Sequence, residues 1–310
     1  MFYSLIHRQG KSYAENDKGL NPNGQVIVSE EVAFKTNAET IPMENAVVKD
    51  IYKEQGPYPY NAEYEDDVKR VLKASVFEKD ATMYYGFWNT DTNEKDGNGV
   101  MIWSDGSRYD GSWKHNMANG HGRHIHSDGD FYIGEWVNDK AEGKGCYTHS
   151  DRAMYNGEWK EDKQNGYGEE TWPDGSKYQG IYKDGKKEGR GIFRWPDGSE
   201  YQGEFVDNNI QGHGVYKWID GKVYDGQWKL NKMNGEGKFI WPNGKCYIGS
   251  YVNDKRHGEG VMEWPSGKKY KGEWENGLQN GKGWYTNKNG ETKLSEWKDG
   301  KRIKFIQNST

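Results

Sequence analysis

The chain has 310 residues, with 43 Lys or Arg against 48 Asp or Glu. This near balance gives no electrostatic case for nucleic-acid binding, which calls for a strongly basic face. Aromatic residues make up 15% of the chain and glycine contributes 42 residues, while hydrophobic residues total only 33%. The aromatic side chains must therefore be buried without the aliphatic core of an ordinary globular domain.

Residues 1–60 carry mixed polar sequence without a repeat. Turn-forming segments such as Asn21-Pro22-Asn23-Gly24 and Gly56-Pro57-Tyr58-Pro59 interrupt short apolar islands such as Val26-Ile27-Val28. Proline and glycine at this density favour turns over regular elements. The pattern predicts an extended N-terminal arm rather than a domain.

Residues 61–80 have a different pattern, in which apolar residues approximate helical spacing. The apolar positions are Tyr64, Val68, Val71, Leu72 and Phe77. Acidic residues precede basic ones in this stretch, which suits the dipole of a helix. The sequence predicts a short amphipathic α-helix, and two roles stay open for it. The helix could cap the open edge of the first hairpin, or it could dock on a partner together with the arm.

Residues 84–305 are organised by an internal repeat. A Tyr-x-Gly-x-aromatic motif recurs nine times, with a first step of 25 residues and later steps of 23. A Gly-x-Gly pair follows in every copy, and an aromatic residue usually stands four positions after the pair. The motif glycines are Gly86, Gly111, Gly134, Gly157, Gly180, Gly203, Gly226, Gly249 and Gly272. A decayed tenth copy ends in Trp297.

Each copy is expected to form a β-hairpin with one aromatic face. Tyr155, Gly157 and Trp159 alternate with polar residues, and so share one face of a strand. Gly166 and Gly168 share a face in the next strand by the same rule. Glycine inside a strand costs about 0.5–1 kcal/mol, so its recurrence indicates that an aromatic ring lies on the bare backbone.

The connections between hairpins carry turn signals. Trp172-Pro173-Asp174-Gly175 places Pro and Gly where a type I turn with a bulge requires them. Arg152 occupies the glycine position of one such turn, so we expect a left-handed or rebuilt backbone there. A lone hairpin is only marginally stable, so the copies must stack and share their aromatic faces.

This motif and its 23-residue period resemble the MORN (membrane occupation and recognition nexus) repeat. The resemblance covers residues 84–305 and implies an all-β fold, an elongated and twisted antiparallel single-sheet solenoid of about nine hairpins. It further implies no catalysis by the repeats themselves. Members of the family include radial spoke head proteins of cilia, so the resemblance implies a cytoplasmic scaffold or adaptor in a cytoskeletal assembly, with the ciliary axoneme as the best setting.

The aromatic and glycine face is the predicted docking groove for protein partners, which could include a second repeat protein or a second copy of the chain. Large apolar surfaces usually mark interfaces, and Tyr and Trp dominate binding energy there. We expect no enzymatic activity, cofactor, metal or small-molecule substrate. The predicted groove residues are Tyr132, Trp136, Tyr155, Trp159, Trp172, Tyr178, Tyr182, Trp195, Tyr201, Phe205, Trp218, Tyr224, Trp228, Trp241, Tyr247, Tyr251, Trp264, Tyr270 and Trp274.

The sequence also raises two other hypotheses. Basic clusters such as Lys268-Lys269-Tyr270-Lys271 raise an alternative function, that of an anionic-phospholipid tether or a regulator of a lipid kinase. Acidic residues are interleaved in most of these clusters, which favours solvated strand ends. His121, His124, His126 and His149 invite a metal hypothesis, but two of them merely fill the Trp position of the repeat.

Overall fold

The computed structural model describes residues 19–20, 26–27, 34, 38, 41, 43–60, 67–77 and 82–306. The chain divides into two compact units, Met1–Gly129 and Asp130–Thr310. In the first unit the elements are β1 (Gly19–Leu20), β2 (Val26–Ile27), α3 (Ala46–Gln55), β3 (Arg70–Phe77), β4 (Thr82–Asn89), β5 (Lys95–Ile102), β6 (Arg108–Lys114) and β7 (Met117–Ile125). Strands β3 to β7 pair in chain order as an antiparallel sheet, and β1 pairs with β2.

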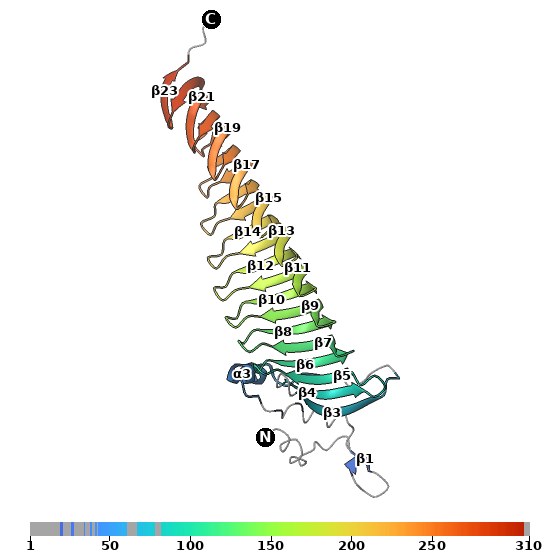
Figure 1. Ribbon diagram of the computed structural model, residues 1–310. Helices are drawn as coiled ribbons and strands as arrows, with labels where there is room; N and C mark the ends of the chain where they lie inside the picture. The colour runs from blue at the N-terminus through green and yellow to red at the C-terminus, as the bar shows by residue number, and fades with distance from the viewer. Residues whose placement is uncertain are drawn as a thin grey trace. The chain divides into compact units, whose positions relative to one another are not determined.

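The second unit is a ladder of hairpins. Its strands are β8 (Phe131–Val137), β9 (Lys140–Thr148), β10 (Met154–Lys160), β11 (Lys163–Thr171), β12 (Lys177–Lys183), β13 (Lys186–Arg194), β14 (Glu200–Val206), β15 (Asn209–Lys217), β16 (Val223–Lys229), β17 (Lys232–Ile240), β18 (Cys246–Val252), β19 (Lys255–Glu263), β20 (Lys269–Glu275), β21 (Leu278–Thr286), β22 (Thr292–Lys298) and β23 (Lys301–Phe305). Each strand pairs antiparallel with the next from β8 to β23, in an elongated and twisted sheet (Figure 1). The predicted all-β fold of repeated hairpins is confirmed.

The core of each hairpin is a tyrosine ring lying over a pair of facing glycines. Gly157 on β10 is the register partner of Gly168 on β11, and Tyr155 is 1% exposed. A Cβ atom added to Gly168 would contact atoms of the Tyr155 ring, and one added to Gly157 would lie 2.6 Å from the Cα of Gly168. Glycine is therefore required here by close approach, as the sequence predicted.

Neighbouring hairpins are joined through the same rings. The Tyr155 ring meets Trp159 of its own strand edge to face, with centroids 5.2 Å apart, and meets Tyr182 of the next hairpin at 5.0 Å. Edge-to-face pairs of this kind add about 0.5–1.5 kcal/mol beyond the area that they bury. Stability in this unit is thus a nearest-neighbour property of the repeats.

Two kinds of connection alternate along the ladder. Within a hairpin the turn is tight, and Glu161 and Asp162 have φ values of 47° and 65°, as a type I′ turn requires. The Asp162 carboxylate also accepts a 2.7 Å hydrogen bond from the amide of Ala141 in the preceding hairpin. Between hairpins, Gly175 has φ 91°, and Arg152 takes the same role with φ 76°. The left-handed turn expected at Arg152 is confirmed.

The helix expected over 61–80 is wrong for its central part, because residues 70–77 form strand β3. This strand pairs with β4 over eight residues, from Arg70 opposite Asn89 to Phe77 opposite Thr82. β-branched and aromatic residues such as Val71 and Phe77 fit a pleated sheet at least as well as a helix, and the pairing decides the outcome. Val68 and Leu72 thus lie beside and within a strand, while Tyr64 lies outside the described residues.

A helix, α3, lies instead within the predicted arm. Asn45 caps it by accepting hydrogen bonds from the amides of Val47 at 2.9 Å and Val48 at 3.2 Å. Only Val48 and Tyr52 of the helix are buried, so its apolar stripe is too short to be conspicuous in the sequence. The expectation of an extended arm over residues 1–60 is therefore wrong for Ala46–Gln55.

Candidate docking surface

The tyrosine that opens each repeat lies beneath the aromatic surface of the second unit. Each hydroxyl donates to a backbone carbonyl three residues on, for example Tyr155 to Glu158 at 2.9 Å. Burial raises the pKa of Tyr155 well above its ordinary value. The buried tyrosines of the predicted groove are Tyr132, Tyr155, Tyr178, Tyr201, Tyr224, Tyr247 and Tyr270, all at most 2% exposed. They support the surface and do not offer their rings to a partner.

The aromatic residue four positions later is also mostly enclosed. Tyr224 meets Trp228 edge to face at 5.1 Å and meets Tyr251 of the next hairpin at 5.2 Å. The Trp228 indole donates a 3.0 Å hydrogen bond to the carbonyl of Gly214. Buried residues of this set are Trp136, Tyr182, Phe205, Trp228, Tyr251 and Trp274, whereas Trp159 is half-buried.

The accessible part of the predicted groove is a row of tryptophans at the ends of alternate strands. We call the half-buried residues Trp172, Trp195, Trp218, Trp241 and Trp264 the tryptophan stripe. Half-buried rings connect its members, because Phe193, Tyr216 and Phe239 lie between them. The ring centroids of Trp195 and Tyr216 are 4.9 Å apart, and those of Tyr216 and Trp218 are 4.3 Å apart. A partner approaching this face would meet a row of aromatic rings in contact from Trp172 to Trp241, with Trp264 one hairpin further along.

One polar cluster interrupts the aromatic face at the start of the stripe. The Glu170 carboxylate forms a 2.7 Å ion pair with Lys187 and accepts a 2.7 Å hydrogen bond from the Tyr182 hydroxyl. The side chains of Lys187 and Glu170 are 14% and 18% exposed. The ammonium also lies 4.8 Å from the ring of Trp172, so both charges are held among aromatic walls. These groups line a hollow of about 470 Å³ with Trp195.

Two cations lie further along the same face. The Lys245 ammonium is 4.3 Å from the Trp241 ring, and the Arg256 guanidinium is 4.4 Å from the Trp274 ring. Arg256 donates a 2.6 Å hydrogen bond to the carbonyl of Gly277. Burial, and then the charge of Arg256, lower the pKa of Lys245. Neither side chain forms an ion pair with a carboxylate of the described residues.

The histidines are distributed among ordinary structural contacts. The His124 and His126 rings pack at 4.1 Å, His121 shares a 2.6 Å hydrogen bond with the Tyr58 hydroxyl, and His149 pairs with Asp130 at 3.1 Å. Within the residues that the structure describes, no group of three or more His, Cys, Asp or Glu is arranged to hold a metal ion.

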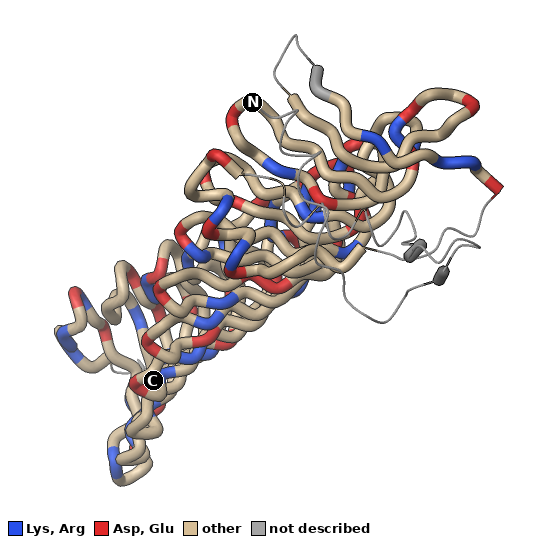
Figure 2. The backbone as a smooth tube through the Cα atoms, turned by 90° about the horizontal axis from the view of Figure 1, so that it is seen from below, with Lys and Arg blue, Asp and Glu red and all other residues tan. Residues whose placement is uncertain are grey.

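The basic clusters are largely interleaved with acids. Lys186 pairs with Asp207 at 2.7 Å and Lys269 with Glu263 at 2.7 Å. Figure 2 shows blue and red positions mixed along the strands of the ladder, without a face of one sign. Among the described helical residues, none form a segment long and apolar enough to span a bilayer.

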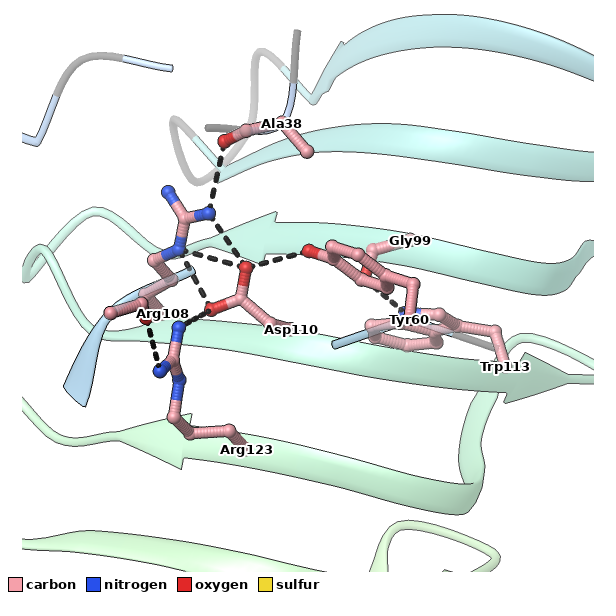
Figure 3. Close-up of polar contacts among 8 residues, drawn as sticks. Ala38, Tyr60, Gly99, Arg108, Asp110, Trp113 and Arg123 are labelled. Carbon is pink, nitrogen blue, oxygen red and sulfur yellow. Dashed lines mark hydrogen bonds and ion pairs between the residues drawn. The ribbon is translucent and has the colours of Figure 1, made fainter. Parts of the chain in front are cut away.

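The first unit contains a buried ionic cluster centred on Asp110 (Figure 3). Arg108 donates to this carboxylate at 2.6 Å, Arg123 reaches it at 3.4 Å, and the Tyr60 hydroxyl donates at 2.7 Å. Both guanidiniums also lie over the ring of Tyr52, at 4.3 and 4.7 Å. Burial alone would raise the pKa of Asp110, but the neighbouring guanidiniums outweigh it and keep the carboxyl ionised.

This cluster fixes the segment 43–60 on the sheet. Arg123 donates at 2.8 Å to the carbonyl of Gly56, and Arg108 donates at 3.1 Å to the carbonyl of Ala38. Tyr58 and Tyr60 join an apolar cluster with Phe87, Tyr85, Val100, Phe34 and Ala38. A face expected to be solvated is therefore covered in this unit by the chain's own N-terminal residues.

Sequence reasoning missed both the ionic cluster and the Lys245–Arg256 pair. A signal for the first exists, because Tyr85 and Phe87 are apolar at positions that are mostly polar in later repeats. For the second, the position of Arg256 varies among the repeats, from Ala141 and Ile210 to Gln164 and Lys187, and so gives no signal. Departures such as those at Tyr85 and Phe87 mark places where something besides the ladder contacts the side chain.

Comparison with known families gives one match along most of the ladder. The family model described as "MORN repeat" matches nine consecutive segments, namely residues 93–108, 109–131, 132–154, 155–177, 178–200, 201–223, 224–246, 247–269 and 270–292. A comparison with curated protein sequences finds no significant match.

Comparison with solved structures finds distant similarity to TCP domains of CPAP proteins. The TCP10 domain of Danio rerio CPAP, solved with a peptide of STIL, is 13% identical with a TM-score of 0.42, covering 77% of this chain and 99% of that one. The TCP domain of Drosophila melanogaster SAS-4 (dCPAP), solved with a proline-rich motif of Ana2, is 16% identical with a TM-score of 0.29, covering 63% of this chain and 99% of that one.

Proposed function

Since the chain belongs to the MORN repeat family, we propose that it is a non-enzymatic scaffold that docks protein partners on the aromatic face of its repeats. The tryptophan stripe supports this proposal most directly. Half-buried indoles from Trp172 to Trp241 form one connected row, with Phe193, Tyr216 and Phe239 between them. Tryptophan and tyrosine side chains are the commonest energetic anchors of protein interfaces.

The rigidity of the surface favours the same function. Tyrosine rings locked over glycine pairs support the stripe from below, as at Tyr201 over Gly203 and Gly214. A preformed surface loses little conformational entropy when a partner binds. The aromatic face is therefore suited to bind a partner protein without rearranging.

We further propose a cytoskeletal setting for this scaffold, with the ciliary axoneme as the first place to look. The support is the resemblance of the repeats to those of radial spoke head proteins. A tagged chain should remain with demembranated axonemes after detergent extraction. Flotation with phosphoinositide vesicles that persists at physiological salt would favour the lipid-tether alternative instead.

The docking face can be tested with a photo-cross-linking amino acid placed at single sites. Position 218 lies in the tryptophan stripe, and position 284 carries a tryptophan that is 45% exposed on the opposite face of β21. In an extract of the source cells, we expect one defined cross-linked partner from position 218 and none from position 284. Equal capture from both positions, or none from 218, would contradict docking on the aromatic face.

A further inference from the structure

The tryptophan stripe has a period that selects among partner conformations. Successive members belong to hairpins 23 residues apart and are separated by two strands, a distance of about 9.6 Å. The ring contacts allow this spacing, because the Phe239 centroid is 5.3 Å from that of Trp218 and 4.4 Å from that of Trp241, which sets an upper limit on the distance between the two indoles. A bound segment running along the ladder would meet an equivalent indole once in every such step.

An α-helix, a β-strand and a polyproline II helix differ in whether the same face of the segment returns at steps of about 9.6 Å. An α-helix advances about 9.6 Å in roughly 6.4 residues, which leaves its contact face turned by about 80° at each tryptophan. A β-strand covers the step in about three residues, so successive tryptophans would face opposite sides of the strand. A polyproline II helix rises about 9.3 Å per three-residue turn, so the same face returns to every tryptophan.

The charges on the aromatic face also restrict which partner segment can bind there. Lys245 and Arg256 lie on the aromatic face beside Trp241 and Trp274, and neither forms an ion pair with a described carboxylate. Two cations partly removed from water repel each other and favour an anionic group between them. Near Trp172, by contrast, Glu170 already neutralises Lys187. The stripe is therefore electrostatically asymmetric along its length.

We infer that the tryptophan stripe receives a proline-rich segment of a partner protein in the polyproline II conformation, with prolines three residues apart, and that a carboxylate of this segment pairs with Lys245 and Arg256. This inference rests on the proposed docking function. Aromatic grooves bind proline-rich segments because the ligand is already extended and loses little entropy on binding. The acidic residue would fix the direction and register of a segment that otherwise repeats itself.

The test uses a fluorescein-labelled peptide with proline at every third position through five turns, ending in two glutamates. Its affinity for the full chain is measured by fluorescence polarisation. We expect Trp218→Leu to weaken binding at least about fivefold, as for an interfacial indole. Trp284→Leu, the matched variant on the opposite face, should leave the affinity unchanged. A peptide of the same composition with proline at every fourth position should bind at least about tenfold more weakly.

The charge contact has its own variant. Lys245→Glu should weaken binding of the acidic peptide and strengthen binding of a peptide that ends in two lysines, whereas Lys229→Glu should change neither. Equal binding of the two proline spacings, preference for an amphipathic helical peptide, or a Lys245-dependent preference for phosphoinositide vesicles would overturn the inference. If the cross-linker at position 218 still captured a partner in that case, the docking function would stand alone. If neither the peptide bound nor the cross-linker at position 218 captured a partner, both the inference and the proposed docking function would be contradicted.

Discussion

At the scale of single residues, the contact between each repeat tyrosine and its two glycines controls whether a hairpin forms. The Tyr155 ring lies directly on the backbone at Gly157 and Gly168, and its hydroxyl is fixed by the carbonyl of Glu158. A side chain at Gly168 must displace the ring, and the ring also packs on Trp159 and Tyr182. One added methyl group therefore disturbs two hairpins.

Gly168→Val is expected to destabilise the chain by more than about 2 kcal/mol, because the displaced ring cannot regain its contacts. Thermal melting and hydrogen exchange of the β10–β12 amides would measure the loss. Glu169→Val, one residue along on the exposed side, serves as the matched control and should change stability by less than about 0.5 kcal/mol. A melting shift below about 2 °C for Gly168→Val would contradict the account.

His124 gives the first unit a pH dependence at the same scale. Burial, and then the neighbouring His126, lower the pKa of His124 to about 4. Below the ordinary histidine pKa of about 6.5, the unfolded chain binds a proton that the folded chain refuses, so stability falls between pH 6.5 and 4. His124→Phe restores the aromatic residue found at Phe193 and should remove this part of the dependence. Melting curves of both proteins that fall equally between pH 7 and 4.5 would show the assignment to be wrong.

At the scale of elements, the ionic cluster on the first unit decides whether α3 and the segment after it stay on the sheet. Asp110 is the only partner that brings Arg108, Arg123 and Tyr60 together in the described contacts. Removing its charge would leave two buried guanidiniums facing each other, and breaking such a buried pair costs about 3–5 kcal/mol. The helix would then lose its anchor before the ladder is affected.

Asp110→Asn should therefore release the segment 43–60, seen as faster hydrogen exchange in α3 and new protease cleavage near Gly56. Asp225→Asn provides the matched control, because Asp225 occupies the same position of the repeat five copies later. Asp225 is 52% exposed in a 3.0 Å pair with His213, so its variant should change stability by less than about 1 kcal/mol. Unchanged exchange in α3 of Asp110→Asn would show that apolar contacts alone hold the segment.

At the scale of the whole molecule, the repeat period decides which changes in length the ladder accepts. Deleting residues 201–223 removes one complete repeat and should leave a folded chain whose ladder is shorter by about 9.6 Å. Deleting only residues 201–211 removes most of β14 and the start of β15, so the strands that follow lose their antiparallel partner and register, and the chain should not fold. Small-angle scattering and circular dichroism distinguish these results, and an unfolded 23-residue deletion would contradict the nearest-neighbour account.

The sequence could predict the parts of the fold that recur. The spacing of residues alone predicts the hairpins, the glycine–tyrosine contacts and the turn at Arg152, because the same pattern recurs in every copy of the repeat. Elements that occur once had no such support. Val71 and Phe77 fit a strand as well as a helix, and only pairing with β4 decides. Likewise, the sequence pattern does not show that Trp218 is half-buried while Tyr224 is fully buried, because both are aromatic residues at fixed positions of the repeat.

The Glu170–Lys187 pair has a consequence for assembly in a chain of near-identical modules. Such modules can exchange partners with another copy, shifted by one whole unit, at little energetic cost. In an arrangement shifted by one repeat, Glu170 would face Ile210 or Gln164 and lose its counterion, so neither neighbouring alignment satisfies it. The ion pair thus favours the correct alignment of these similar repeats over the alignments shifted by one repeat. Replacing it with Phe and Ile should preserve the melting temperature while increasing the fraction of domain-swapped dimers on size-exclusion chromatography.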